Sequence, residues 1–95
     1  MLHDLQKSIL FCLKDKSKTR YSVSKELKVS TSGLKYHFDQ LIEQGLVKKN
    51  CEGFILNEDK VQVKEDMLLV NFANEFQMYA KKDSKAENFF KNFFR

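Results

Sequence analysis

Few side chains in this sequence have the types and spacing that catalysis or metal binding requires. The two histidines, His3 and His37, have no acidic residue placed to complete a catalytic triad, and Cys12 and Cys51 do not form a CxxC pair. The sequence has no glycine-rich phosphate loop and no His, Cys and carboxylate cluster with metal-ligand spacing. We therefore expect no enzyme activity, no metal site and no cofactor, with His37 as a packed structural residue and Cys12 as a small core residue.

A polar stripe on one predicted helix is the strongest candidate for a binding surface. Leu34, Phe38 and Leu41 follow Ser30 at spacings of three and four, so the residues between them face outward. Ser30 can cap the start of this helix, and Gly45 stands where a left-handed residue ends one. The hydroxyl and ammonium groups that face outward from the first half of the helix could bond to base edges in a DNA groove. These residues are Thr31, Ser32, Lys35 and Tyr36.

The charge distribution agrees with a polyanion as partner. The net charge is +4, and residues 1–50 carry ten basic side chains against five acidic ones. Residues 52–75 are the reverse, with six acidic side chains and two lysines. A basic half can attract nucleic acid, although the same excess is also common on solvated surfaces.

The elements that must position the stripe follow from capping residues and changes of period. Apolar residues at helical spacing predict a first helix over residues 2–14, and Ser22 is placed to cap a second helix with Val23 and Leu27 turned inward. The third helix runs from Ser30 to Gly45. Residues 46–49 and 54–56 then predict two short strands joined by a turn at residues 50–53.

This order of elements carries a family resemblance. Residues 21–47 resemble the winged helix-turn-helix of bacterial and archaeal regulators, especially the ArsR-like group, and residues 43–47 look like the family's junction between helix and wing. The matching core positions are Val23, Leu27, Val29, Leu34, Phe38, Leu41, Leu46 and Val47. The resemblance implies double-stranded DNA as partner, and it implies phosphate contacts from Tyr21, Ser22, Lys25, Lys48 and Lys49. The metal-binding cysteine pair of many ArsR proteins is absent, so metal sensing is not implied.

The C-terminal 39 residues lie outside the resemblance. An apolar stripe strongest over residues 68–80 and a capping-box pattern at residues 84–87 predict further helices, which together would expose a large apolar surface. We expect these helices to pair two subunits in a homodimer. The residues expected at the subunit contact are Leu68, Leu69, Phe72, Phe76, Tyr79, Phe89, Phe90, Phe93 and Phe94. Two alternatives stay open, namely a tail that folds back on its own core and an amphipathic segment on a membrane surface.

Together these observations predict the fold and function of the chain. The fold class is mainly α with a small β-hairpin (α+β), with a winged helix-turn-helix over residues 1–56 and C-terminal dimerisation helices over residues 57–95. The expected function is a sequence-specific DNA-binding regulator of transcription, most simply a repressor. The composition of a soluble protein, with no membrane span or signal peptide, predicts a cytoplasmic location.

Three further points complete the expectation. No small-molecule effector is evident in the sequence. A redox role for Cys51 in the hairpin turn stays open. The alternative function is a winged-helix protein-interaction module whose Phe-rich tail docks on a larger partner.

Overall fold

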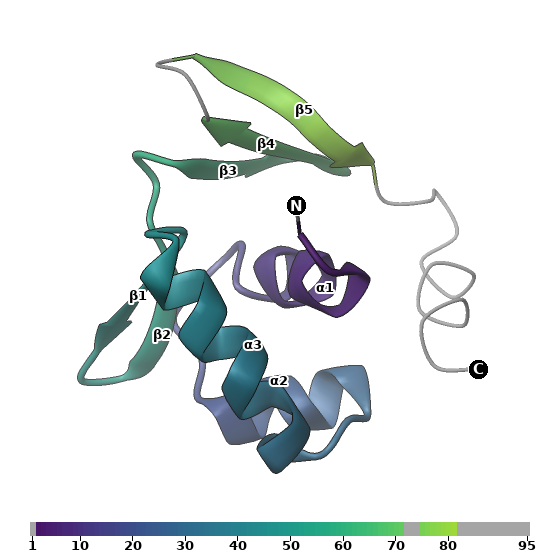
Figure 1. The fold of residues 1–95 in the computed structure, drawn as a ribbon, viewed down its shortest axis with the longest axis vertical. Coiled ribbons are helices and arrows are strands. Elements are labelled where there is room, and N and C mark those ends of the chain that lie inside the picture. Colours follow the sequence, from purple (N-terminus) through teal and green to yellow (C-terminus); the bar gives the residue numbers. More distant parts are fainter. Residues whose placement is uncertain (1, 72–74, 82–95) are drawn as a thin grey trace.

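The structure is a computed structural model that describes residues 2–71 and 75–81. Its helices are α1 (Asp4–Cys12), α2 (Arg20–Leu27) and α3 (Thr31–Glu43), and its strands are β1 (Val47–Asn50), β2 (Gly53–Leu56), β3 (Val61–Lys64), β4 (Met67–Asn71) and β5 (Phe76–Lys81). Helix α1 lies between the β3-β4-β5 sheet on one side and α2 and α3 on the other (Figure 1). The small β1-β2 hairpin, called the wing below, projects beside α3 (Figure 1).

The helix-turn-helix forms where the sequence predicts it, with one change of cap. Thr19, and not Ser22, caps α2, because the Thr19 hydroxyl accepts the Ser22 amide at 3.0 Å. Lys28 then takes a left-handed conformation at the end of α2, with φ 58°. As predicted, Ser30 caps α3 by accepting the Gly33 amide, and Gly45 follows this helix with φ 78°.

The wing is a short antiparallel hairpin tied to the loop between α1 and α2. Its turn is at the predicted residues, with Asn50 paired to Gly53. The backbone of Phe54 also exchanges two hydrogen bonds with the backbone of Lys18, at 2.9 and 2.8 Å. The Asn50 side-chain amide donates to the Ser17 hydroxyl at 2.8 Å. These contacts fix the wing against the helical part of the fold.

The prediction of helices after residue 57 is wrong for residues 61–71 and 76–81, which form a three-stranded antiparallel sheet. The apolar residues at 68 and 70 alternate with less buried neighbours, as they do on a strand. The β3–β4 turn consists of Glu65 and Asp66, with Glu65 at φ 54°. The part of the prediction that concerns residues 82–95 lies outside the described residues.

One hydrophobic cluster joins the helices to this sheet. Ile9, Leu10 and Phe38 are buried in the same cluster as Val61 and Leu68. Contacts between α1 and β4 carry the core across the boundary predicted at residue 57. The sheet therefore packs on the back of α1 and leaves the outer face of α3 open among the described residues.

Candidate nucleic-acid interface

The outer face of α3 presents the four residues predicted to read DNA bases. Thr31, Ser32, Lys35 and Tyr36 are all exposed, and Tyr36 keeps 64% of its surface accessible. The opposite face is held in the core by Leu34, Phe38 and Leu41, each at 0% exposure. Thr31, Ser32 and Gly33 in the first turn of α3 are exposed, and a helix N-terminus favours a phosphate. This helix thus has the chemistry and exposure to enter a major groove.

Lys35 is not free in this structure. Its ammonium lies 2.8 Å from the carboxylate of Asp39, one turn further along the same exposed face. Both side chains are more than half exposed, so water screens the pair and the bond is weak. Lys35 can therefore leave Asp39 for a base at low cost, while the carboxylate stays on the face that would meet the DNA.

Helix α2 carries the first group of predicted phosphate contacts, with Tyr21 and Ser22 in its first turn and Lys25 in its last turn rather than at the predicted start. Tyr21 and Lys25 are exposed, and the Lys25 ammonium lies 5.3 Å from the centre of the Tyr21 ring. Ser22 is half-buried in the first turn of the helix. The neighbouring Ser24 is buried and donates its hydroxyl to the Tyr21 carbonyl at 2.7 Å, so a small polar residue is accommodated beside α3.

The two wing lysines face opposite sides of the hairpin. Lys48 and Lys49 are both exposed on β1, but Lys48 is paired with Ile55 and Lys49 with Phe54. Side chains of paired residues share a face of a sheet and alternate along each strand. Lys49 therefore lies on the face of Phe54, whose ring packs against Phe38 of α3, and Lys48 lies on the other face.

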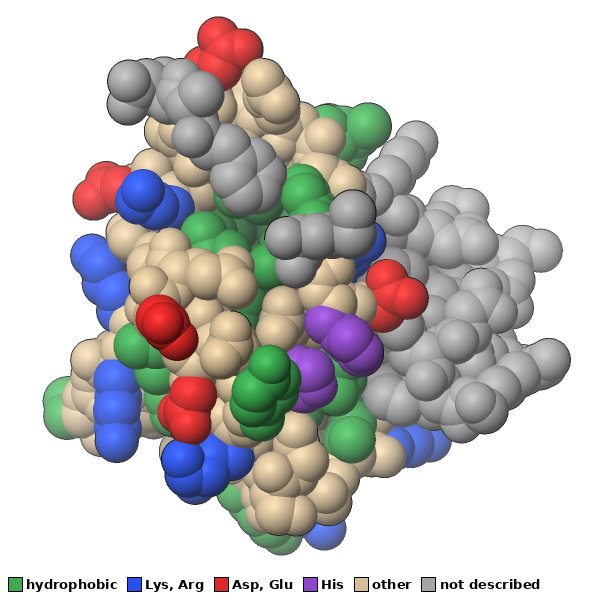
Figure 2. Space-filling view, in the orientation of Figure 1, with side chains coloured by type: hydrophobic (Ala, Val, Ile, Leu, Met, Phe, Trp, Pro, Cys, Tyr) green, Lys and Arg blue, Asp and Glu red, His purple; other side chains and the backbone are tan. Residues whose placement is uncertain are grey.

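Basic side chains gather over the wing and over the end of the molecule formed by α2 and α3, with acidic side chains between them (Figure 2). This mixed pattern is weaker than a continuous basic patch.

Cys12 belongs to a polar cluster, and the prediction of a simple core residue misses this. Its thiol donates to the Glu26 carboxylate at 3.3 Å, and the Lys18 ammonium lies 2.9 Å from the same carboxylate. Burial raises the pKa of Cys12 to about 12, and the hydrogen bond to Glu26 adds to the effect. Burial alone would raise the pKa of Glu26, but its bonds to Lys18 and Cys12 outweigh burial and lower it. Cys51, by contrast, is exposed as predicted.

The histidines form a cluster that the sequence does not reveal. The rings of His3 and His37 lie 4.8 Å apart, and Gln6 Nε2 lies 3.1 Å from His37 Nδ1. The two rings are the adjacent purple side chains in Figure 2. The partners come from residues 31 positions apart, so no local motif signals the contact. His37 is a half-buried structural residue, as predicted, with a specific hydrogen bond.

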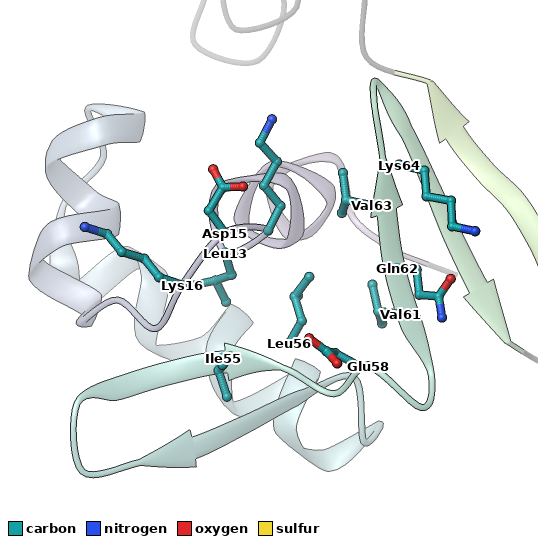
Figure 3. A pocket seen from close by; sticks show the side chains of 11 residues that line it. Leu13, Asp15, Lys16, Ile55, Leu56, Glu58, Val61, Gln62, Val63 and Lys64 are labelled. Atoms are coloured by element: carbon teal, nitrogen blue, oxygen red, sulfur yellow. The ribbon is translucent and has the colours of Figure 1, made fainter.

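A hollow of about 440 Å³ lies between the wing, strand β3 and the loop after α1. Leu56 and Val61 lie at its centre, and the side chains of Lys16 and Lys64 extend from it on opposite sides (Figure 3). These two cations do not converge on a common point, so the hollow lacks the focused polar groups that fix a small ligand.

The residues predicted at the subunit contact have different environments. Leu68 is fully buried in the core of this chain. Leu69 and Phe76 are partly exposed, and Tyr79 packs against the core, where its hydroxyl accepts the Leu2 amide at 2.8 Å. Met78, which is not among the predicted contact residues, is 59% exposed. Phe72, Phe89, Phe90, Phe93 and Phe94 lie outside the described residues.

The described residues contain neither a metal-binding cluster nor a membrane-spanning helix. Within residues 2–71 and 75–81, no group of three or more His, Cys, Asp or Glu side chains is arranged to hold a metal ion. In the same part of the chain, no helix has the length and apolar character needed to cross a membrane.

Comparison with known proteins identifies the helical part of the fold. Residues 4–49 match the family model described as bacterial regulatory protein, arsR family. The match begins with α1, includes α2 and α3, and ends within β1. No curated protein and no solved structure matches the chain significantly.

Proposed function

We infer that the chain is an ArsR-like winged helix-turn-helix regulator of transcription, because residues 4–49 match the arsR family model. On that premise we propose that it is a sequence-specific repressor that binds double-stranded DNA as a homodimer. Regulators of this family are DNA-binding proteins and not enzymes. The observation that carries the proposal is the outer face of α3, where four hydrogen-bonding side chains are exposed over a firmly buried inner face.

In this proposal α3 reads bases and the elements around it hold the backbone. Thr31, Ser32, Lys35 and Tyr36 meet base edges in the major groove. Phosphates are met by Tyr21, Ser22 and Lys25 of α2 and by Lys48 and Lys49 of the wing, which gives affinity without sequence information. Occupation of a promoter by this complex would repress transcription without a further domain.

The homodimer is proposed from the need to present two reading helices about 34 Å apart on successive turns of DNA. Leu68 cannot take part, because it is enclosed in the core of its own chain. The available apolar surface on the sheet consists of the partly exposed Leu69 and Phe76 and the exposed Met78. Phe89, Phe90, Phe93 and Phe94 are also proposed as contact residues and lie outside the described residues.

A two-part experiment on the full chain tests this function. Selection from a random duplex library should enrich one motif with twofold symmetry. Affinity for that motif should fall with a log-log salt slope of about −0.9 per phosphate, so roughly six to ten contacts lose about a thousandfold or more between 50 and 200 mM salt. Sedimentation should show a dimer at micromolar concentration. Absence of DNA binding at low salt would favour the alternative function as a protein-interaction module. A monomer that binds a single half-site would contradict the homodimer.

A further inference from the structure

A chain of hydrogen bonds connects the start of α1 to the reading helix through Gln6. The backbone amide of His3 donates to Gln6 Oε1 at 3.1 Å, and Gln6 Nε2 lies 3.1 Å from His37 Nδ1. His3 also caps α1, because its Nδ1 accepts the Leu5 amide at 3.0 Å. Gln6 is only 5% exposed, so water cannot readily replace either of its partners.

This network fixes the protonation of His37. The Gln6 oxygen already accepts the His3 amide, so the Gln6 nitrogen must be the donor to His37. His37 Nδ1 therefore needs a free lone pair, as does His3 Nδ1 where it receives the Leu5 amide. The His37 ring is therefore neutral, with its proton on Nε2.

His37 stands between α1 and one of the proposed base-reading residues. On one side its ring is 4.8 Å from that of His3, and on the other it meets the Tyr36 ring edge-on, with 5.4 Å between centres and an angle of 75°. Tyr36 is thus braced by a ring whose own position depends on Gln6.

Proton binding at His37 is opposed by its surroundings. Burial lowers the pKa of His37 below its ordinary 6.5, and a positive charge on His3, when that ring is protonated, lowers it further. The nearby charged residues of α1, Asp4 and Lys7, pair with each other at 3.6 Å, and on α3 the Asp39 carboxylate pairs with Lys35. On α2 the Glu26 carboxylate pairs with Lys18, and on β1 Lys48 and Lys49 are exposed. Charges on α2 and β1 do not contribute to this shift.

We propose that neutral His37 is a positioning residue for the reading helix, and that its protonation releases Gln6, displaces Tyr36 and weakens DNA binding in mildly acidic solution. This inference rests on the proposed function. The unfolded chain binds the proton more readily than the folded chain, so the contribution of His37 to stability is complete above about pH 6.5 and is lost as the pH falls below that value.

The direction of the pH effect on DNA affinity distinguishes a positioning histidine from one that only adds positive charge. A histidine that only adds positive charge near DNA strengthens binding as the pH falls. A histidine that must stay neutral to hold Tyr36 weakens it instead. Between pH 7.5 and 5.5 at constant ionic strength, we expect the affinity of the wild-type chain for its selected duplex to fall by about threefold per subunit, because each His37 must release its proton before the duplex binds.

Two matched variants show which histidine binds the proton that weakens DNA binding. His37→Asn retains a neutral acceptor for Gln6, so it should bind well at pH 7.5 and give a flat profile. His3→Asn retains a capping acceptor for α1, so it should keep the acid-induced loss. The proposal is overturned if acid strengthens binding of the wild-type chain, or if His37→Asn loses affinity in acid as the wild-type chain does.

A measurement without DNA separates this inference from the proposed function. In an NMR titration of the wild-type chain, the ring signals of Tyr36 should shift with the same midpoint as those of His37. Failure to bind any duplex at pH 7.5 would refute the proposed function and the effect on DNA. Tyr36 signals that do not change as His37 titrates would refute the positioning role. Because this measurement uses the wild-type chain, it holds even if a variant does not fold.

Discussion

The centre of the Phe54 ring on the wing lies 4.5 Å from the centre of the Phe38 ring on the reading helix, with an angle of 37° between the ring planes. Phe38 is fully buried and Phe54 is half-buried, so this pair joins an exposed hairpin to the core. The orientation of the wing relative to α3 is set here and by the backbone bonds to Lys18.

Replacing Phe54 should therefore loosen the wing as well as reduce stability. Because the side chain is only half-buried, Phe54→Ala should cost about 2 kcal/mol, less than a full core truncation. Urea denaturation would measure this loss. Phe54→Leu, which keeps apolar contact with Phe38, should recover most of it, and equal losses in the two variants would contradict a packing role.

Lys35→Ala should change which sequences are preferred. Loss of its ammonium from the outer face of α3 should cost about 1 to 3 kcal/mol per half-site on the best duplex and relax the preference at one base pair. The matched control is Asp39→Asn, which frees Lys35 and removes an anion from the same face. It should strengthen binding to all duplexes, as measured by anisotropy on a panel of single-base variants.

The wing lysines should not contribute equally. Lys49 shares the face of Phe54 beside α3, whereas Lys48 points to the other side. We expect Lys49→Ala to weaken all duplexes by a similar factor and to make the salt slope shallower by about one, with a smaller effect for Lys48→Ala. Similar losses in the two single variants would show that the hairpin does not meet phosphates by one face.

Gly53 should be far less tolerant of a side chain than Gly45. Both have positive φ, 132° and 78° respectively, but a Cβ on Gly53 would overlap the Lys18 backbone, whereas the nearest atom to one on Gly45 is Lys60 Cδ at 3.9 Å. Gly45→Ala should cost about 1 to 2 kcal/mol for its backbone conformation. Gly53→Ala should cost more than about 3 kcal/mol, because the bridge to Lys18 must also separate. Thermal unfolding of both variants measures the two losses. A larger loss for Gly45→Ala than for Gly53→Ala would contradict the bridge between the wing and Lys18.

The two thiols should react very differently at pH 8. With a pKa of about 12, Cys12 has roughly one part in ten thousand as thiolate at that pH, whereas Cys51 is exposed. Iodoacetamide followed by mass spectrometry should label Cys51 first and Cys12 only on unfolding. Comparable rates in the folded chain would disprove the half-buried cluster with Glu26. Cys51→Ser provides the control in which Cys12 is followed alone.

The helical half of the fold was predictable because its signals are local. Ser30, Gly45 and the spacing of Leu34, Phe38 and Leu41 locate α3 and its outer face without knowledge of the rest of the chain. The pairing of Asn50 with Gly53 likewise follows from a four-residue turn.

The sheet was missed because its apolar residues fit two periods. Leu68, Leu69 and Phe76 can be placed on one helical stripe, and the turn at Glu65 and Asp66 contains none of the Gly or Asn residues that usually mark a tight hairpin. Burial of Leu68 against the helical core decides in favour of a strand, and this contact is not local. The Gln6–His37 contact was hidden for the same reason.

The hydrogen bond from the Leu2 amide to the Tyr79 hydroxyl spans 77 positions of the chain. Closing so long a loop has a large entropic cost that local helix contacts do not share. During folding, the three helices and the wing can therefore assemble early, and the sheet joins them late. Until that last step, the back of α1 is uncovered, and the newly made chain has its greatest tendency to associate wrongly.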